Sequence, residues 1–132
     1  MMRCIQILVL VVISLLGCSK NDENDIITND SIIGQWQLIE RFDGGSLEPI
    51  QNIENGEIIF FKSDFLYSNS NYPCTGNYLI NNDNIVEITV SCVSSENLLY
   101  TYDFENGYLL FNSYPSTCDE GCYDKYKRFY SE

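Results

Sequence analysis

The chain contains 132 residues, carries a formal net charge of −12, and has no histidine. So acidic a protein is repelled by phosphate backbones, which argues against nucleic acid as a partner. The lack of histidine removes the usual general base and the commonest metal ligand. The composition therefore points away from most hydrolytic and metal-dependent chemistry.

The N-terminal segment is organised like an export signal. Arg3 precedes an apolar run, Ile5 to Leu16, that only Gln6 and Ser14 interrupt. A helix of this length extends about 18 Å, which is too short for a hydrocarbon core of about 30 Å. Such a run is typical of the apolar region of a signal peptide, so we expect residues 1–17 to be removed.

The run ends in Leu15-Leu16-Gly17-Cys18, which resembles the lipobox of bacterial lipoproteins. The resemblance implies cleavage after Gly17, attachment of diacylglycerol to the Cys18 sulfur and acylation of the new amino group. Each buried methylene of an acyl chain contributes about 0.8 kcal/mol, so several chains hold a protein durably on a membrane without spanning it. The alternative is an ordinary secretory signal with a chance cysteine at its end.

Residues 18–31 form the next segment, which is polar, acidic and without apolar periodicity. Such a composition cannot bury enough surface to fold, so we expect a lipidated cysteine followed by a tether. The cluster Asp22, Glu23 and Asp25 resembles the surface-export tags of some Gram-negative lipoproteins. We therefore expect anchoring to the bacterial outer membrane, with exposure at the cell surface if the cluster acts as a tag. A solvated linker is the alternative.

Residues 32–132 are long enough for one domain. Loss of Arg3 leaves six lysines and arginines against 19 acidic residues, which gives the mature chain a net charge of −13. This charge favours solubility and attraction to cationic partners.

Short β-branched or aromatic runs bounded by Asn, Asp, Gly and Ser recur through this domain, and no segment has a convincing helical period. The pattern predicts eight strands, at 34–41, 56–62, 64–71, 74–81, 85–92, 97–105, 108–114 and 124–131. Short turns join most of them, and segment 42–55 is the long connection. An antiparallel meander rich in aromatics favours an all-β, up-and-down barrel over an open sheet. The run Ile58 to Phe61 is apolar on both faces, so its inward face is undecided.

Two hairpins set the register. Asn106-Gly107 predicts a type I′ turn that pairs Phe104 with Leu109 and Tyr102 with Phe111. The turn at 82–84 pairs Ile80 with Val86 and Tyr78 with Ile88.

Four cysteines remain besides Cys18, and an exported chain with an even number of thiols predicts two disulfides. The second hairpin places Cys74 opposite Cys92 at a distance that a disulfide can bridge. Elimination then pairs Cys118 with Cys122. A bond from one of the first two cysteines to the loop before the last strand is the alternative.

Gly34-Gln35-Trp36 on the first strand, the eight-stranded meander and Arg128 on the last strand together resemble the lipocalin superfamily. The likeness is greatest to the small lipocalin-like domains of Gram-negative lipoproteins, and it covers residues 32–131. In lipocalins the tryptophan closes the barrel floor and an arginine stacks over it. The resemblance implies these roles for Trp36 and Arg128, whose cation–π contact would contribute about 0.5–2 kcal/mol. The chain is much shorter than typical lipocalins, which implies short strands and lid loops. It also has no counterpart of their Thr-Asp-Tyr motif, and these departures argue against a roomy ligand cup.

The pattern contains no catalytic constellation, so we expect a non-enzymatic protein without cofactor or metal. The loop 118–122 has the form of a metal loop, but an oxidising compartment favours its disulfide. Acidic residues are abundant, which leaves a glycosidase pair as a remote alternative. The candidate ligand-binding residues are the aromatics that the register turns inward, Tyr78, Tyr100, Tyr102, Phe104 and Phe111. They would either pack the core or line a pocket for an apolar ligand.

An eight-stranded barrel either fills itself with side chains or holds one small ligand. The sequence therefore predicts a membrane-anchored binding protein for a small, partly apolar ligand. The alternative is a protein-interaction module with a packed interior and active loops. It would be an accessory subunit of a surface complex or an inhibitor of a cationic enzyme such as lysozyme.

Overall fold

The structure is a computed structural model that describes residues 31–45, 50–119 and 121–130. The expected signal peptide at 1–17, the lipidated Cys18 and the tether up to residue 30 lie outside the described residues. Within the described ranges, the chain has no helix that combines the length and hydropathy needed to cross a membrane.

The described part of the chain is all-β and has nine strands. Eight of them correspond to the eight runs predicted from the sequence, and most are shorter by one or two residues at an end, where the loops leave the ladder. Their bounds are β1 (Gly34–Phe42), β2 (Gln51–Asn52), β3 (Ile58–Phe61), β4 (Leu66–Asn69), β5 (Gly76–Ile80), β6 (Ile85–Thr89), β7 (Leu98–Glu105), β8 (Tyr108–Ser113) and β9 (Tyr123–Arg128).

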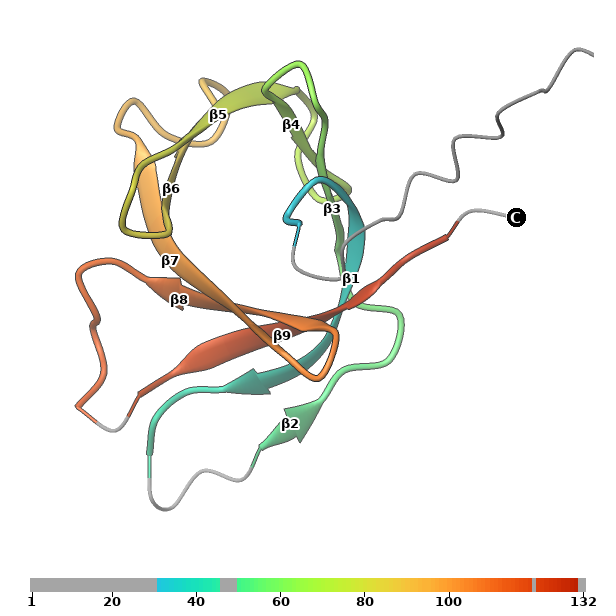
Figure 1. Ribbon diagram of the computed structural model, residues 1–132, viewed down its shortest axis with the longest axis vertical. Helices are drawn as coiled ribbons and strands as arrows, with labels where there is room; N and C mark the ends of the chain where they lie inside the picture. The colour runs from blue at the N-terminus through green and yellow to red at the C-terminus, as the bar shows by residue number, and fades with distance from the viewer. Residues whose placement is uncertain (1–30, 46–49, 120, 131–132) are drawn as a thin grey trace, which may run out of the picture.

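The strands close into an eight-stranded antiparallel barrel (Figure 1). From β3 to β9 each strand pairs with the next in the chain, and β9 closes the ring on β1. The expected up-and-down barrel is confirmed. The ninth strand, β2, lies within the segment 42–55 that was expected to be only a connection, and it pairs with β1 at Glu40 and Arg41. The sequence did not predict β2 because a strand of two residues is too short to show an alternating pattern.

Both hairpins have the predicted register. Asn106 and Gly107 have φ values of 52° and 81°, as a type I′ turn requires, and Phe104 pairs with Leu109. Between β5 and β6, Tyr78 pairs with Ile88. Gly76 permits the close approach of these strands, because a Cβ there would lie 2.1 Å from the carbonyl oxygen of Thr89.

Both predicted disulfides are present. The Cys74–Cys92 bond joins the segments just beyond the paired part of β5 and β6, with a Cα separation of 6.3 Å. The Cys118–Cys122 bond lies in the loop between β8 and β9. The alternative connectivity is therefore wrong.

The pairing of β1 with β3 decides which face of β3 is inward. Trp36 pairs with Ile59, so these two side chains project from the same face of the sheet. Ile59 and Phe61 are fully buried, whereas Ile58 and Phe60 are half-buried on the outer face. The neighbouring strand supplies the information that an all-apolar run lacks.

Trp36 closes one end of the barrel, which we call the floor. Its ring is fully buried, and its Nε1–H donates to the carbonyl of Ile32 at 2.7 Å. The Arg128 guanidinium lies 4.0 Å from the ring centroid and donates to the carbonyls of Ser31 and Ile33. Gly34 is required here because its φ is +128° and a Cβ would meet the Arg128 guanidinium at 2.2 Å.

Candidate functional site

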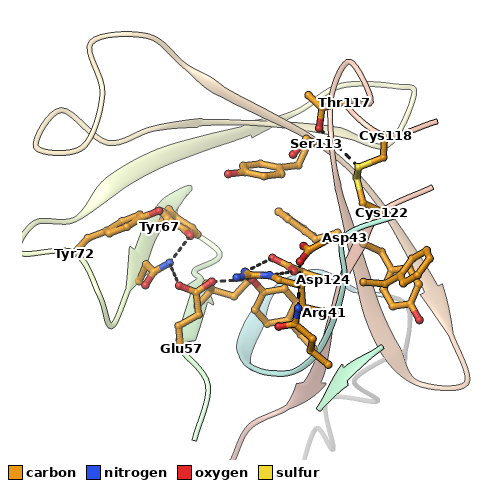
Figure 2. Close-up of a pocket in the computed structure, with 18 residues that line it drawn as sticks. Arg41, Asp43, Glu57, Tyr67, Tyr72, Ser113, Thr117, Cys118, Cys122 and Asp124 are labelled. Carbon is orange, nitrogen blue, oxygen red and sulfur yellow. Dashed lines mark hydrogen bonds and ion pairs between the residues drawn. A yellow bond between two sulfur atoms is a disulfide. The ribbon is translucent and has the colours of Figure 1, made fainter. Parts of the chain in front are cut away.

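A cavity of about 560 Å³ opens at the barrel end opposite the floor, which we call the open end. β1 runs from the floor toward this end, and the loops after β4, β6 and β8 lie there. The cavity lining consists mainly of polar and aromatic side chains: Arg41, Phe42, Asp43, Gln51, Glu57, Ile59, Tyr67, Asn69, Tyr72, Tyr100, Phe111, Ser113, Thr117, Cys118, Cys122, Tyr123, Asp124 and Tyr126. Figure 2 shows Tyr67 and Tyr72 on one side and the Cys118–Cys122 loop on the other.

A β-bulge in β1 turns Arg41 into the cavity. Leu38 pairs with Tyr126 on β9, but the next pair is Glu40 with Lys125, so β1 has one extra residue at Ile39. In a regular strand without a bulge, the alternation from Trp36 and Leu38 would direct position 41 outward. Beyond the bulge, Arg41 pairs with Asp124, and both line the cavity.

Arg41 and Asp124 form a bidentate ion pair. Arg41 Nε and Nη2 donate to the two Asp124 carboxylate oxygens at 2.6 and 2.8 Å. The hydrogen bond to Asp124 raises the pKa of Arg41 above its ordinary value against the opposing effect of burial, and the charges of Asp124 and Glu57 add to the rise. The pair fixes the guanidinium at the wall of the cavity (Figure 2).

Glu57, just before β3, is held by neutral donors. The Tyr126 hydroxyl donates to its Oε1 at 2.9 Å, and the side-chain amides of Asn69 and Asn71 donate to its Oε2 at 3.0 and 3.1 Å. Asn69 is buried and also contacts the hydroxyl of Tyr67 at 3.4 Å. This network orients the carboxylate and satisfies the polar groups around it.

The tyrosines of the lining keep their protons. Burial raises the pKa of Tyr67 and of Tyr126 far above the usual value near 10, and the Glu57 charge adds to both shifts. Burial also raises the pKa of Tyr72 and Tyr100, again with a contribution from Glu57. At neutral pH the cavity therefore presents neutral phenols beside a carboxylate.

The five aromatics predicted as candidate ligand contacts fall into two groups. Tyr100 and Phe111 line the cavity with ring centroids 5.0 Å apart. Tyr78 is buried against Phe61, and its hydroxyl donates to the carbonyl of Lys62 at 2.7 Å.

Tyr102 and Phe104 form the rest of the second group and lie toward the floor. Their ring centroids are 6.0 Å apart, and Phe104 is also 6.0 Å from Trp36. The cavity lining therefore includes two of the five candidates and not the other three.

Sequence reasoning did not select the charged residues of the lining. Asp124, Tyr126 and Arg128 alternate along the last predicted strand, so their common face was open to detection. Glu57 precedes an apolar run, which is a weaker signal. The inward direction of Arg41 could not be predicted from the sequence, because it depends on the bulge in β1.

Comparison of the chain with models of known families and with curated proteins found no match.

Proposed function

We propose that this protein is a non-enzymatic lipoprotein, anchored to the outer membrane through Cys18, whose barrel binds a small, partly apolar ligand. The observation that supports this most is the cavity of about 560 Å³ at the open end. Small-molecule sites commonly enclose about 300–1,000 Å³ and combine aromatic walls with a few oriented polar groups. Tyr100 and Phe111 supply such a wall, and Arg41 and Glu57 supply such groups.

The same cavity favours a carrier over a protein-interaction module. A module that acts through its loops needs a packed interior, whereas this barrel is filled on the floor side and hollow on the other. The non-enzymatic part of the proposal rests on the missing histidine and on the oxidised state of four cysteines.

Native mass spectrometry of the full-length protein purified from bacterial envelopes tests the carrier. We expect a reproducible small-molecule adduct, removable by solvent extraction and displaced by an apolar dye. Ser113→Trp should abolish the adduct, because a large ring at this exposed position would enter the cavity. Ser63→Trp is the matched control, since Ser63 is exposed in the turn between β3 and β4 at the floor end. A bare polypeptide that binds no dye would overturn the carrier and direct attention to protein partners.

Metabolic labelling with a fatty acid tests the anchor. Cys18→Ser should abolish labelling and leave the precursor uncleaved, whereas Cys4→Ser should label like the parent because it lies within the signal. Labelled protein should fractionate with the outer membrane, and protease added to intact cells should digest it if the acidic cluster directs it to the surface. Normal labelling of the Cys18→Ser variant would contradict the proposal that Cys18 carries the lipid.

A further inference from the structure

The charges of the cavity lining do not balance. Among the described lining residues, Arg41 is the one lysine or arginine, and both Asp124 oxygens accept from it. Asp43 and Glu57 add two more carboxylates. Counted by formal charge, the described lining residues therefore carry an excess of two negative charges. Anionic ligands are disfavoured there, and cations are attracted from solution.

Glu57 forms no ion pair with any described lysine or arginine, although its charge also acts on Arg41. The ion pairs of the described residues are Arg41–Asp124 and Lys125–Glu40, and neither includes Glu57. Its three donors are a phenol and two amides, which orient the carboxylate without cancelling its charge. A carboxylate has about four acceptor sites, so one remains for a further donor. An oriented anion inside a cavity is a ready partner for a positively charged group.

Tyrosine side chains line the same cavity as this carboxylate. Tyr67, Tyr72 and Tyr100 are among them, and the side-chain amide of Asn69 donates to both Glu57 and the Tyr67 hydroxyl. The Glu57 charge also contributes to the raised pKa of the three hydroxyls. The faces of neutral aromatic rings attract cations, and clusters of such rings are typical sites for quaternary ammonium groups. A carboxylate with several tyrosines therefore suits an organic cation.

A bare metal ion fits this site less well. The described residues contain no cluster of three or more side chains arranged to hold a metal ion. Three donors already bind the Glu57 oxygens and leave about one acceptor site, whereas hard metal ions need several oxygen ligands.

We propose that the ligand of the cavity is a small organic cation. Its ammonium group would lie against Glu57 and the rings of Tyr67, Tyr72 and Tyr100, with its apolar part on Phe111. The proposal deepens the carrier function and rests on it, because it names the chemical class that the same cavity takes.

Calorimetry with two probes of one shape tests the class. The full-length protein, in a polyoxyethylene detergent, is titrated with choline and with dimethylbutanol, the uncharged isostere in which carbon replaces the quaternary nitrogen. We expect choline to bind at least about tenfold more tightly, since a desolvated cation–π contact and a facing carboxylate exceed the 1.4 kcal/mol that this ratio represents. Added salt should weaken the binding of choline and leave the affinity for the isostere unchanged.

Variants assign the preference to the named groups. Glu57→Gln should lower the affinity for choline about tenfold and leave the affinity for dimethylbutanol unchanged. Because Glu57 also orders its neighbours, Tyr72→Leu provides a second test; it should weaken choline about fivefold through loss of one ring. Asp83→Asn is the matched control for charge, because Asp83 lies in the exposed turn between β5 and β6 at the floor end. It should bind both probes like the parent.

The outcomes separate the two proposals. Equal affinity for both probes would show a ligand cavity without cation preference, so the class would be wrong while the carrier stands. A choline loss in Asp83→Asn as large as in Glu57→Gln would assign the effect to net charge and overturn the site. If neither probe binds and the envelope-purified protein carries no adduct, both proposals fail.

Discussion

The two ends of the barrel each contain one inward arginine from the same pair of strands, but they use it differently. At the floor, Arg128 of β9 lies over the fully buried Trp36 and donates to backbone carbonyls. At the open end, Arg41 of β1 is paired with a carboxylate and faces a cavity. One end is closed by packing, and the other is open and charged.

The difference shows how a short barrel separates a packed, stabilising end from an open, polar end. Aromatic burial at the floor removes a large apolar surface from water, which is the main favourable contribution to folding. The open-end ion pair is partly exposed, with 41% and 26% side-chain exposure, so solvent screens it and it contributes little to stability. The floor side therefore supports the fold, while the open end presents polar and charged groups to the cavity.

The largest expected effect is on the floor. Trp36→Ala should lower the free energy of unfolding by about 3–5 kcal/mol, because it empties a fully buried site and leaves Arg128 without its ring. Urea denaturation measures the change. The matched change at the open end, Asp124→Asn, should cost at most about 1 kcal/mol.

Equal losses of unfolding free energy in Trp36→Ala and Asp124→Asn would contradict the view that the floor contributes more to stability than the open end. So would a Trp36→Ala protein as stable as the parent, because the floor would then not depend on the tryptophan.

A smaller effect concerns the tyrosines of the open end at high pH. Tyr67 and Tyr126 keep their protons in the folded state above the pH near 10 at which an unfolded tyrosine ionises. Their contribution is therefore fully present below about pH 10, and it is lost as the pH rises further because the unfolded state then binds fewer protons. The free energy of unfolding should fall by about 1.4 kcal/mol per pH unit for each tyrosine.

Denaturation midpoints measured on either side of pH 10 report this slope, and unfolding above pH 10 should add tyrosinate absorbance as the buried hydroxyls ionise. The free energy of unfolding of Tyr126→Phe should fall less steeply with pH than that of the parent over the same interval. If the two slopes agree, the Tyr126 hydroxyl does not titrate with unfolding as its burial requires.

Local sequence rules were sufficient for much of the architecture. Asn106-Gly107 specifies a turn that needs two positive φ values, and strict alternation in the strand after the 82–84 turn specifies one register. That register placed Cys74 beside Cys92, and the bond is present. These features depend on residues close in the chain, where backbone geometry leaves few options.

The candidate site was only partly accessible in this way. Tyr100 and Phe111 were selected by inward alternation, and they line the cavity together with charged residues that alternation alone did not connect. Tyr102 and Phe104 share the same inward face but lie nearer the floor. A strand pattern indicates which face a side chain takes, but it does not indicate at what height along the barrel the interior is hollow.

The sequence by itself determined the all-β class and the two hairpin registers, because these follow from local patterns of residues. It predicted the first disulfide from one of those registers and the second by elimination, and both are present. Only the tertiary structure decided which face of β3 is buried, because the run Ile58 to Phe61 is apolar on both sides. Its pairing with β1 places Ile59 on the same inward face as Trp36. The bulge at Ile39 arises from the closure of β1 against β9, and it turns Arg41 toward Asp124. The polar cavity follows from that closure, because contacts between the first and last strands depend on the whole ring.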